Sequence, residues 1–188
     1  MRTIAAGLVL LLLLLGCQRV VVPGPLPPHA GDAVQLNAGY GLLINLLEQE
    51  ARVDGLLSIR TLPPSTTQLV KAIARDASVG AAELKSAKDD PPVINWDSEG
   101  LPVTEIEARN LIASQTSLKL LSTSGKAGEL ELLLSQLKAT EYIAALSSSL
   151  LGRDRSEARR AVLKQVNEAF LQHHQALRVA LEQGWDSD

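Results

Sequence analysis

The sequence predicts an all-α protein built as an antiparallel four-helix bundle with a possible short fifth helix. From Asp32 onward, apolar residues recur at three- and four-residue steps, which is the spacing of one helix face. Aliphatic residues dominate the 46% hydrophobic content, whereas aromatic residues make up only 3%. Breaks that contain proline or glycine divide the periodic part into segments of helical length.

Two helices are expected in the first half of the chain. The first has apolar residues at positions 43, 46, 47, 53 and 57 and should end before the prolines at 63–64. The second should open with a capping box, in which Ser65 and Gln68 satisfy free backbone amides. Its apolar stripe then runs over residues 69–84.

Two long helices and one shorter one are expected in the second half. Residues 88–102 contain three prolines and several acidic residues, and this composition predicts a loop. Thr104 should cap a helix that reaches about residue 121, and the turn-forming residues at 122–125 should interrupt it. A strongly apolar helix is then expected up to Gly152. Asp154 and Glu157 should cap the last helix, which reaches about Gln183 and has the clearest apolar stripe.

The N-terminus has the architecture of an export signal. Arg2 supplies a short positive region, and the stretch from Ile4 to Leu15 is continuously apolar. A permanent membrane helix needs about 20 apolar residues, so this stretch is too short to remain as one. Residues 1–16 are therefore expected to be a signal peptide that is removed.

The residues that end this signal resemble the lipobox of bacterial lipoproteins. Leu14, Leu15 and Gly16 directly precede Cys17, the single cysteine of the chain. The resemblance implies that a peptidase cuts before Cys17 and that this cysteine carries acyl chains such as palmitate. Gln18 stands where an aspartate marks inner-membrane retention in Gram-negative lipoproteins, so the outer membrane, facing the periplasm, is expected. The alternative is a plain signal peptide followed by an unmodified cysteine.

The rest of the chain divides into a tether and one domain. Residues 17–32 should form a lipidated tether, because the segment 19–30 has four prolines and no helical period. Residues 33–188 should form the helical bundle domain, since no repeat or change of composition divides them.

Two segments carry a family resemblance. Residues 69–84 (LVKAIARDASVGAAEL) and 124–146 (SGKAGELELLLSQLKATEYIAAL) resemble segments of a widespread group of bacterial outer-membrane proteins of unknown function. Members of that group have a ferritin-like bundle, and the resemblance covers about residues 35–183. It implies a ferritin-like arrangement of the four main helices.

The family pattern includes three histidines. Two of them fall where this chain has Ala77 and Thr140, and the third falls at His173 or His174. Two of the three are therefore absent, so the resemblance does not by itself imply for this chain the metal or polar chemistry that they serve.

Three ionisable residues on inward-facing helix positions are candidates for a metal site. Glu50, Glu141 and His173 each lie among apolar neighbours on a helical wheel, and Asp76 or Glu83 would assist them. Carboxylates and imidazole are suitable ligands for iron, manganese or zinc. Against this hypothesis, the Glu-x-x-His pair of di-iron proteins does not occur in the sequence.

Two alternatives to a metal site remain open. In the first, Glu50 and Glu141 lie at the edge of the bundle in contact with water, and His173 is a hydrogen-bonded core residue. In the second, these side chains form a buried polar network that fixes the register of the helices. Both alternatives imply a protein without a bound cofactor, which is the expectation we retain.

Two other features have a structural and a functional interpretation. A basic cluster that would contact anionic lipid headgroups consists of Arg153, Arg155, Arg159 and Arg160. Because Asp154 and Glu157 interleave with these arginines, a solvated helix start is the favoured interpretation. Trp96 would be a recognition residue at the end of the bundle. The favoured interpretation is that Trp96 covers the core beneath its loop.

Composition and motifs exclude several classes of function. With 18 basic against 21 acidic residues the chain lacks the positive charge of a nucleic-acid-binding protein. A nucleophile elbow, a phosphate-binding glycine loop and a clustered zinc motif are all absent, so no enzymatic activity is expected. The favoured function is a membrane-anchored envelope lipoprotein whose bundle contacts an envelope protein or the cell wall. The alternative is a metal-binding or stress-related ferritin-like protein.

Overall fold

The computed structural model describes residues 32–58, 60–96 and 101–185. These residues are all-α and include no strand, which confirms the all-α part of the expected fold class. The elements are α1 (Asp32–Glu50), the 3-10 helix η1 (Val53–Ser58), α2 (Pro64–Ser86), α3 (Val103–Ser122), α4 (Gly125–Leu151) and α5 (Glu157–Trp185). The expected signal peptide, Cys17 and almost all of the tether lie outside the described residues.

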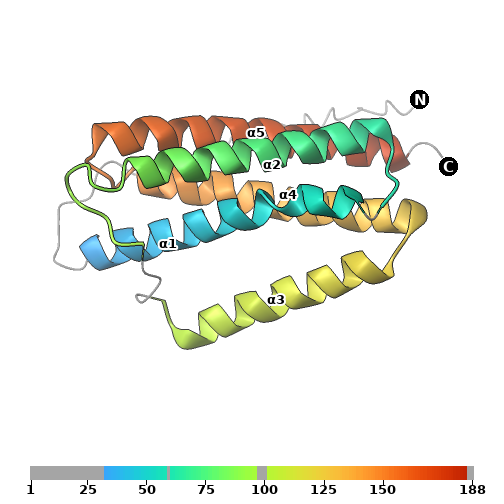
Figure 1. Ribbon diagram of the computed structural model, residues 1–188, viewed down its shortest axis with the longest axis horizontal. Helices are drawn as coiled ribbons and strands as arrows, with labels where there is room; N and C mark the ends of the chain where they lie inside the picture. Colours follow the sequence, from blue (N-terminus) through green and yellow to red (C-terminus); the bar gives the residue numbers. More distant parts are fainter. Residues whose placement is uncertain (1–31, 59, 97–100, 186–188) are drawn as a thin grey trace, which may run out of the picture.

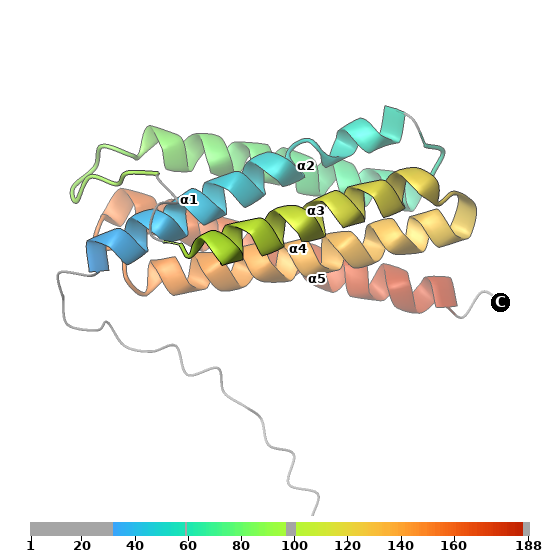
Figure 2. The same cartoon turned by 90° about the horizontal axis from the view of Figure 1, so that it is seen from below.

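The contacts of four helices close a ring. α4 packs along α5, α5 packs against α2, α2 against α1, and α1 against α4 (Figure 1). The fifth helix, α3, lies outside this ring, and its main contacts are with α4 (Figure 2). With 20 residues α3 is not a short helix, and its bounds lie close to the expected range of 104 to about 121. None of the described helices combines the length and the apolar character that a membrane span requires.

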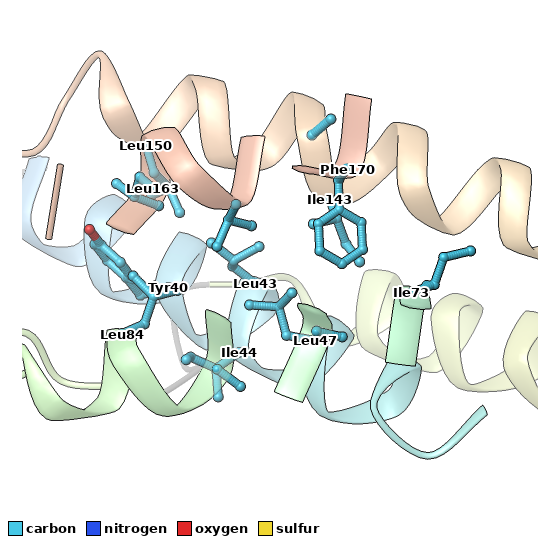
Figure 3. Close-up of a cluster of buried hydrophobic side chains, with 14 of the residues drawn as sticks. Tyr40, Leu43, Ile44, Leu47, Ile73, Leu84, Ile143, Leu150, Leu163 and Phe170 are labelled. Atoms are coloured by element: carbon cyan, nitrogen blue, oxygen red, sulfur yellow. The ribbon is translucent and has the colours of Figure 1, made fainter. Parts of the chain in front are cut away.

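The main hydrophobic core runs along the inside of the ring. All four ring helices contribute to it, and Figure 3 shows Tyr40, Leu43, Ile44, Leu47, Ile73, Leu84, Ile143, Leu150, Leu163 and Phe170. Complete burial of one such aliphatic or phenyl side chain stabilises the fold by about 1.5–3 kcal/mol. This shared core, and not helix propensity alone, therefore holds the four helices together.

A second, smaller core joins η1 and the end of α3 to the bundle. Val70 of α2, Leu120 of α3 and Leu132 of α4 are buried together. Partly buried residues from η1 and the segment after it cover them: Val53, Leu56, Leu57 and Leu62. Leu120 is the buried residue of α3, so this cluster fixes the C-terminal end of that helix.

Two of the expected helix caps are wrong. α2 begins at Pro64, one residue before the expected cap Ser65, and α3 begins directly after Pro102 at Val103. Neither helix start has a side-chain cap. Proline suits a helix start because its ring fixes φ near the helical value, and at the first helical position its missing N–H has no acceptor to lose.

The expected cap of α5 is displaced by two residues. Ser156 Oγ accepts the amide of Arg159 at 3.1 Å, while Asp154 Oδ1 accepts the amide of Ser156 at 2.8 Å. Ser156 is thus the capping residue, and Asp154 holds it in place. The break before α4 is confirmed: Gly125 has a φ of 61°, which an L side chain rarely adopts.

Candidate functional site

The structure does not bring the three metal candidates together. Within the described ranges there is no group of three or more His, Cys, Asp or Glu side chains that could hold a metal ion. Glu141 is exposed on α4, as the alternative of a carboxylate in contact with water has it, and the inward position required by the metal hypothesis is wrong. The inner face of α4 passes instead through Gln136, Thr140 and Ser147, one position away on the helical wheel. Glu83, the expected assisting residue on α2, is also exposed.

Glu50 takes part in a polar pair between α1 and α4. Its Oε2 accepts a hydrogen bond from Gln136 Nε2 at 2.8 Å, and Gln136 is almost completely buried. Burial raises the pKa of Glu50 from its ordinary value of 4.5 to about 7, and the bond from Gln136 opposes this only in part. Gln136 Oε1 accepts no hydrogen bond from the described residues. A protonated Glu50 has an O–H to donate, which suits an amide whose acceptor is unused.

His173 forms a second pair, with Asp76 of α2. Its Nε2 lies 2.8 Å from Asp76 Oδ2, and its ring meets Phe170 edge-on with 5.8 Å between centroids. The side chain of His173 is 12% exposed and that of Asp76 is 28% exposed. Partial burial opposes ionisation of Asp76, yet hydrogen bonds from Arg75 and His173 lower the pKa of its carboxyl. The pair links α5 to α2, as expected of a hydrogen-bonded core histidine.

The most deeply buried polar group lies at the end of the bundle where α2 ends and α5 begins. It centres on Arg159, whose side chain is 0% exposed and pairs with the equally buried Asp154. Arg159 Nε lies 2.7 Å from Asp154 Oδ2, and its Nη2 lies 2.9 Å from Asp154 Oδ1, which makes a bidentate pair. We call Arg159, Asp154, Tyr40, Ser156 and Asp90 the arginine hub.

The arginine hub holds the loop between α2 and α3. Arg159 donates to the backbone carbonyls of Ala87 (3.3 Å), Pro92 (2.7 Å) and Asp90. With the two bonds to Asp154, all five N–H donors of the guanidinium have protein acceptors. Ser156 Oγ also donates to the Asp90 carboxylate. The hub therefore ties this loop to the start of α5.

Tyr40 completes the hub from the side of α1. Its hydroxyl donates to Asp154 Oδ2 at 2.5 Å, and its ring lies 5.8 Å from the Arg159 guanidinium carbon. Burial and the neighbouring Asp154 raise the pKa of the Tyr40 phenol. Burial opposes ionisation of Asp154, but bonds from Arg159, Tyr40 and the Ser156 amide lower the pKa of its carboxyl. Asp154 is thus the common acceptor of groups from α1 and α5.

Trp96 covers the hub from outside. Its ring meets Tyr40 in an edge-on contact with 5.3 Å between centroids, and it packs on the main core. Asn95, its neighbour, donates its backbone amide to Asn37 Oδ1 at 3.1 Å. The prediction that Trp96 covers the core beneath its loop is confirmed.

The expected solvated cluster of arginines is correct for some members and wrong for Arg159. Arg153, Arg155 and Arg160 are exposed, and Arg160 donates to the carbonyls of Leu151 and Asp154. Arg159 points inward instead. The charge pattern gave no signal for this, because most of its partners are backbone carbonyls about 70 residues earlier in the chain.

A groove of about 490 Å³ lies between the end of α1 and α2. It is lined by Glu48, Ala51, Arg52, Ser78, Ala81, Ala82 and Lys85. Lys85 forms an ion pair with Glu48, and Arg52 Nε donates to the Glu48 carbonyl. The cations of the groove are thus engaged with the protein itself, and the groove contains none of the hub residues.

The arrangement as a whole favours structural roles for the buried polar groups. Comparison of the chain with protein-family models, curated proteins and solved structures finds no match.

Proposed function

We propose that the chain is a membrane-anchored envelope lipoprotein whose helical domain is a non-enzymatic interaction module. The observation that carries the proposal is Cys17, the single cysteine, placed directly after a short apolar signal and a lipobox-like Leu-Leu-Gly. Acyl chains on Cys17 would hold the protein at the outer membrane, facing the periplasm. Two or more chains are needed for a stable anchor.

The proposed division of the chain follows from this anchor. Residues 1–16 are the signal peptide, residues 17–32 the lipidated tether, and residues 33–188 the bundle. A proline-rich tether extends by up to about 3 Å per residue, so it holds the domain away from the membrane to which Cys17 is attached. We assign the domain to the antiparallel four-helix, ferritin-like class. The ring of contacts among α1, α2, α4 and α5 supports this assignment.

The non-enzymatic role is supported by the way in which the buried polar groups are used. The guanidinium donors of Arg159 are all occupied, and Asp154 accepts bonds from three residues. A catalytic group needs a free donor, acceptor or lone pair directed at a substrate. The hub offers no such group, whereas the surface of α3 exposes several large apolar side chains. Binding of a partner is therefore favoured over catalysis.

The metal-binding alternative has no observation in its favour among residues 32–58, 60–96 and 101–185. Glu50 is bonded to Gln136, His173 is bonded to Asp76, and Glu141 faces outward. A protein metal site normally needs three or four converging ligands. We therefore do not retain it as a second proposal.

Expression of the full-length chain in a Gram-negative bacterium with labelled palmitate tests the anchor. The wild-type protein should incorporate label and sediment with the outer membrane, and Cys17→Ser should lose both properties. Gln18→Asp is the matched control, because it keeps the lipid but should move the protein to the inner membrane. Incorporation of label by Cys17→Ser, or a wild-type protein without label, would contradict the proposal.

A further inference from the structure

Helix α3 is packed on one side only. Its contacts with α4 are polar along most of its length: Arg109 Nη2 donates to Tyr142 Oη at 2.5 Å, and Lys119 pairs with Glu131 at 2.6 Å. The Arg109 guanidinium carbon also lies 4.9 Å from the Tyr142 ring centroid. Of the 20 residues of α3, only Leu120 is buried. Figure 2 shows the helix lying along α4 at the outside of the bundle.

The other side of α3 is apolar and exposed. Five large side chains are each more than half exposed: Val103 70%, Leu111 59%, Ile112 62%, Leu118 65% and Leu121 59%. Leu111 and Leu118 are seven residues apart, so they lie on one line along the helix, and Leu121 lies beside Leu118. We call Leu111, Leu118 and Leu121, with Val103 and Ile112 at the sides, the α3 face. The exposed Glu107 lies between Val103 and Leu111 on the same side of the helix, so the three leucines form the uninterrupted part of the face. Exposed apolar patches mark interaction sites in soluble proteins.

The centre of the α3 face has no charge. The residues between Leu111 and Leu118 are Ile, Ala, Ser, Gln, Thr and Ser. The basic residues of the helix, Arg109 and Lys119, are paired with Glu105 and Glu131 respectively. Two identical faces would therefore meet without like-charge repulsion at their centre, and the two Glu107 side chains would lie at opposite ends of an antiparallel pair. An anionic membrane surface or a strongly charged partner would find no complementary charge there.

We propose that the α3 face pairs with the α3 face of a second copy of this chain. In an antiparallel pair related by a two-fold axis, Leu111 lies opposite Leu118 of the second copy, and the reverse contact follows by symmetry. The axis passes between Ser114 and Gln115, and the small side chain of Ser114 permits close approach of the helices. This pairing covers the apolar stripe of both copies at once.

The available area is sufficient for such a dimer. The pairing covers the exposed parts of Leu111, Leu118 and Leu121 together with the exposed polar side chains beside them, Ser114, Gln115 and Ser122. These amount to about 500 Å² per copy, and two copies bury about 1,000 Å², the lower limit for a specific interface. Anchored copies meet at a raised effective concentration, so a weak interface is enough. A second copy of the chain is thus the partner of the interaction module proposed above, and the inference rests on that proposed function. Cys17→Ser tests the anchor separately, so a failed anchor and a failed pairing give different results.

Cysteine cross-linking of the full-length protein in its own membrane fraction tests the pairing. Ser114→Cys places a thiol beside the proposed axis, and Ser78→Cys places one on the exposed surface of α2 as the matched control. The unsubstituted protein, whose one cysteine is Cys17, gives the background. On mild oxidation most of the Ser114→Cys protein should run as a dimer, and the Ser78→Cys protein should stay at background. Equal cross-linking of the two variants overturns the proposal.

A second pair of variants separates a specific interface from chance contact. Leu118→Glu, made in the Ser114→Cys protein, should reduce the cross-linked fraction at least five-fold. Leu171→Glu is the control, because Leu171 is 53% exposed on α5, away from the α3 face; it should leave cross-linking unchanged. A cross-linked fraction that Leu118→Glu leaves unchanged overturns the pairing. The pairing is also overturned if the protein is monomeric and its Cys17→Ser form binds phosphatidylcholine vesicles in a way that Leu118→Glu abolishes. The α3 face would then contact lipid.

Discussion

Arg159 Nε lies 2.7 Å from Asp154 Oδ2, and both side chains are completely excluded from solvent. A buried ion pair gains little over an apolar pair of the same size, but loss of one partner leaves an isolated charge in a medium of low dielectric constant. Because Arg159 also donates to three carbonyls of residues 87–92, directly after α2, loss of Arg159 also removes the bonds that hold this segment.

Replacement of Arg159 should therefore be among the most destabilising single changes in the domain. We expect Arg159→Met to lower the free energy of unfolding by about 3–5 kcal/mol, since it leaves Asp154 buried and unpaired. Arg159→Lys should also be costly, because one ammonium group cannot replace a five-donor fork. Urea unfolding followed by circular dichroism measures both effects. Arg155→Met, at an exposed position, is the control and should stay within about 0.5 kcal/mol of wild type.

Charge pattern alone could not predict the position of Arg159. Arg153, Arg155 and Arg160 are exposed as the interleaved acidic residues suggested, and Arg159 has the same sequence neighbourhood. Its burial depends on carbonyl oxygens of residues 87–92, and backbone carbonyls have no sequence signature. Tyr40, the third member of the hub, comes from a helix more than 100 residues earlier in the chain. Contacts of this range are visible only after folding.

Elements with local signals were predictable. The break at 122–125, the end of α4 at Gly152 and the loop that carries Trp96 all contain proline, glycine or serine at the positions that the backbone requires. The face of α4 was not, because its inner stripe contains the polar residues Gln136, Thr140 and Ser147, which an apolar pattern does not select. That one-position rotation is the reason why Glu141 was expected inside.

Glu50 should make the stability of the protein depend on pH near neutrality. Its pKa in the folded state is about 7, above the ordinary value of 4.5, so the folded protein holds this proton more tightly than the unfolded chain does. The contribution of Glu50 to the free energy of unfolding is therefore highest below about pH 4.5. It should fall by about 3 kcal/mol as the pH rises to about 7, and then become level.

Urea unfolding at several pH values between about 5 and 8 measures this slope. Glu50→Gln removes the ionisation and keeps a side chain that can bond Gln136, so it should flatten the slope. Glu141→Gln is the control on the exposed side of α4 and should leave the slope as in wild type. Identical slopes in wild type and Glu50→Gln would show that Glu50 is ionised in the folded protein.

Gly80 should resist enlargement. A Cβ atom at this position would lie 2.8 Å from Val166 Cγ2 of α5, and the β-branched valine has little freedom to rotate away. We expect Gly80→Ala to destabilise the protein by about 1–2 kcal/mol despite the higher helix propensity of alanine. Thermal unfolding measures the change. Gly39→Ala is the control, because its new atom meets the flexible end of Leu150, and its stability should be close to that of wild type. A Gly80→Ala protein as stable as wild type would refute the close approach of Gly80 to Val166.

The protein should hold no stoichiometric metal. Among the described residues no three candidate ligands converge, so added iron, manganese or zinc finds no site in that part of the chain through which it would stabilise the fold. Elemental analysis of protein purified without chelator, with melting curves in each metal, should give sub-stoichiometric metal and unchanged melting temperatures. Bound metal that disappears in His173→Ala but persists in Glu141→Ala would require a site around the His173–Asp76 pair.

The mass of the N-terminal peptide tests the central claim, attachment to the membrane through Cys17, most directly. Protein purified from membranes after expression of the full-length chain should yield an N-terminal fragment that begins at Cys17 and carries the added mass of at least two acyl chains. A fragment that begins at another residue, or that begins at Cys17 with a free thiol, would contradict lipid anchoring and leave the helical domain without its proposed attachment.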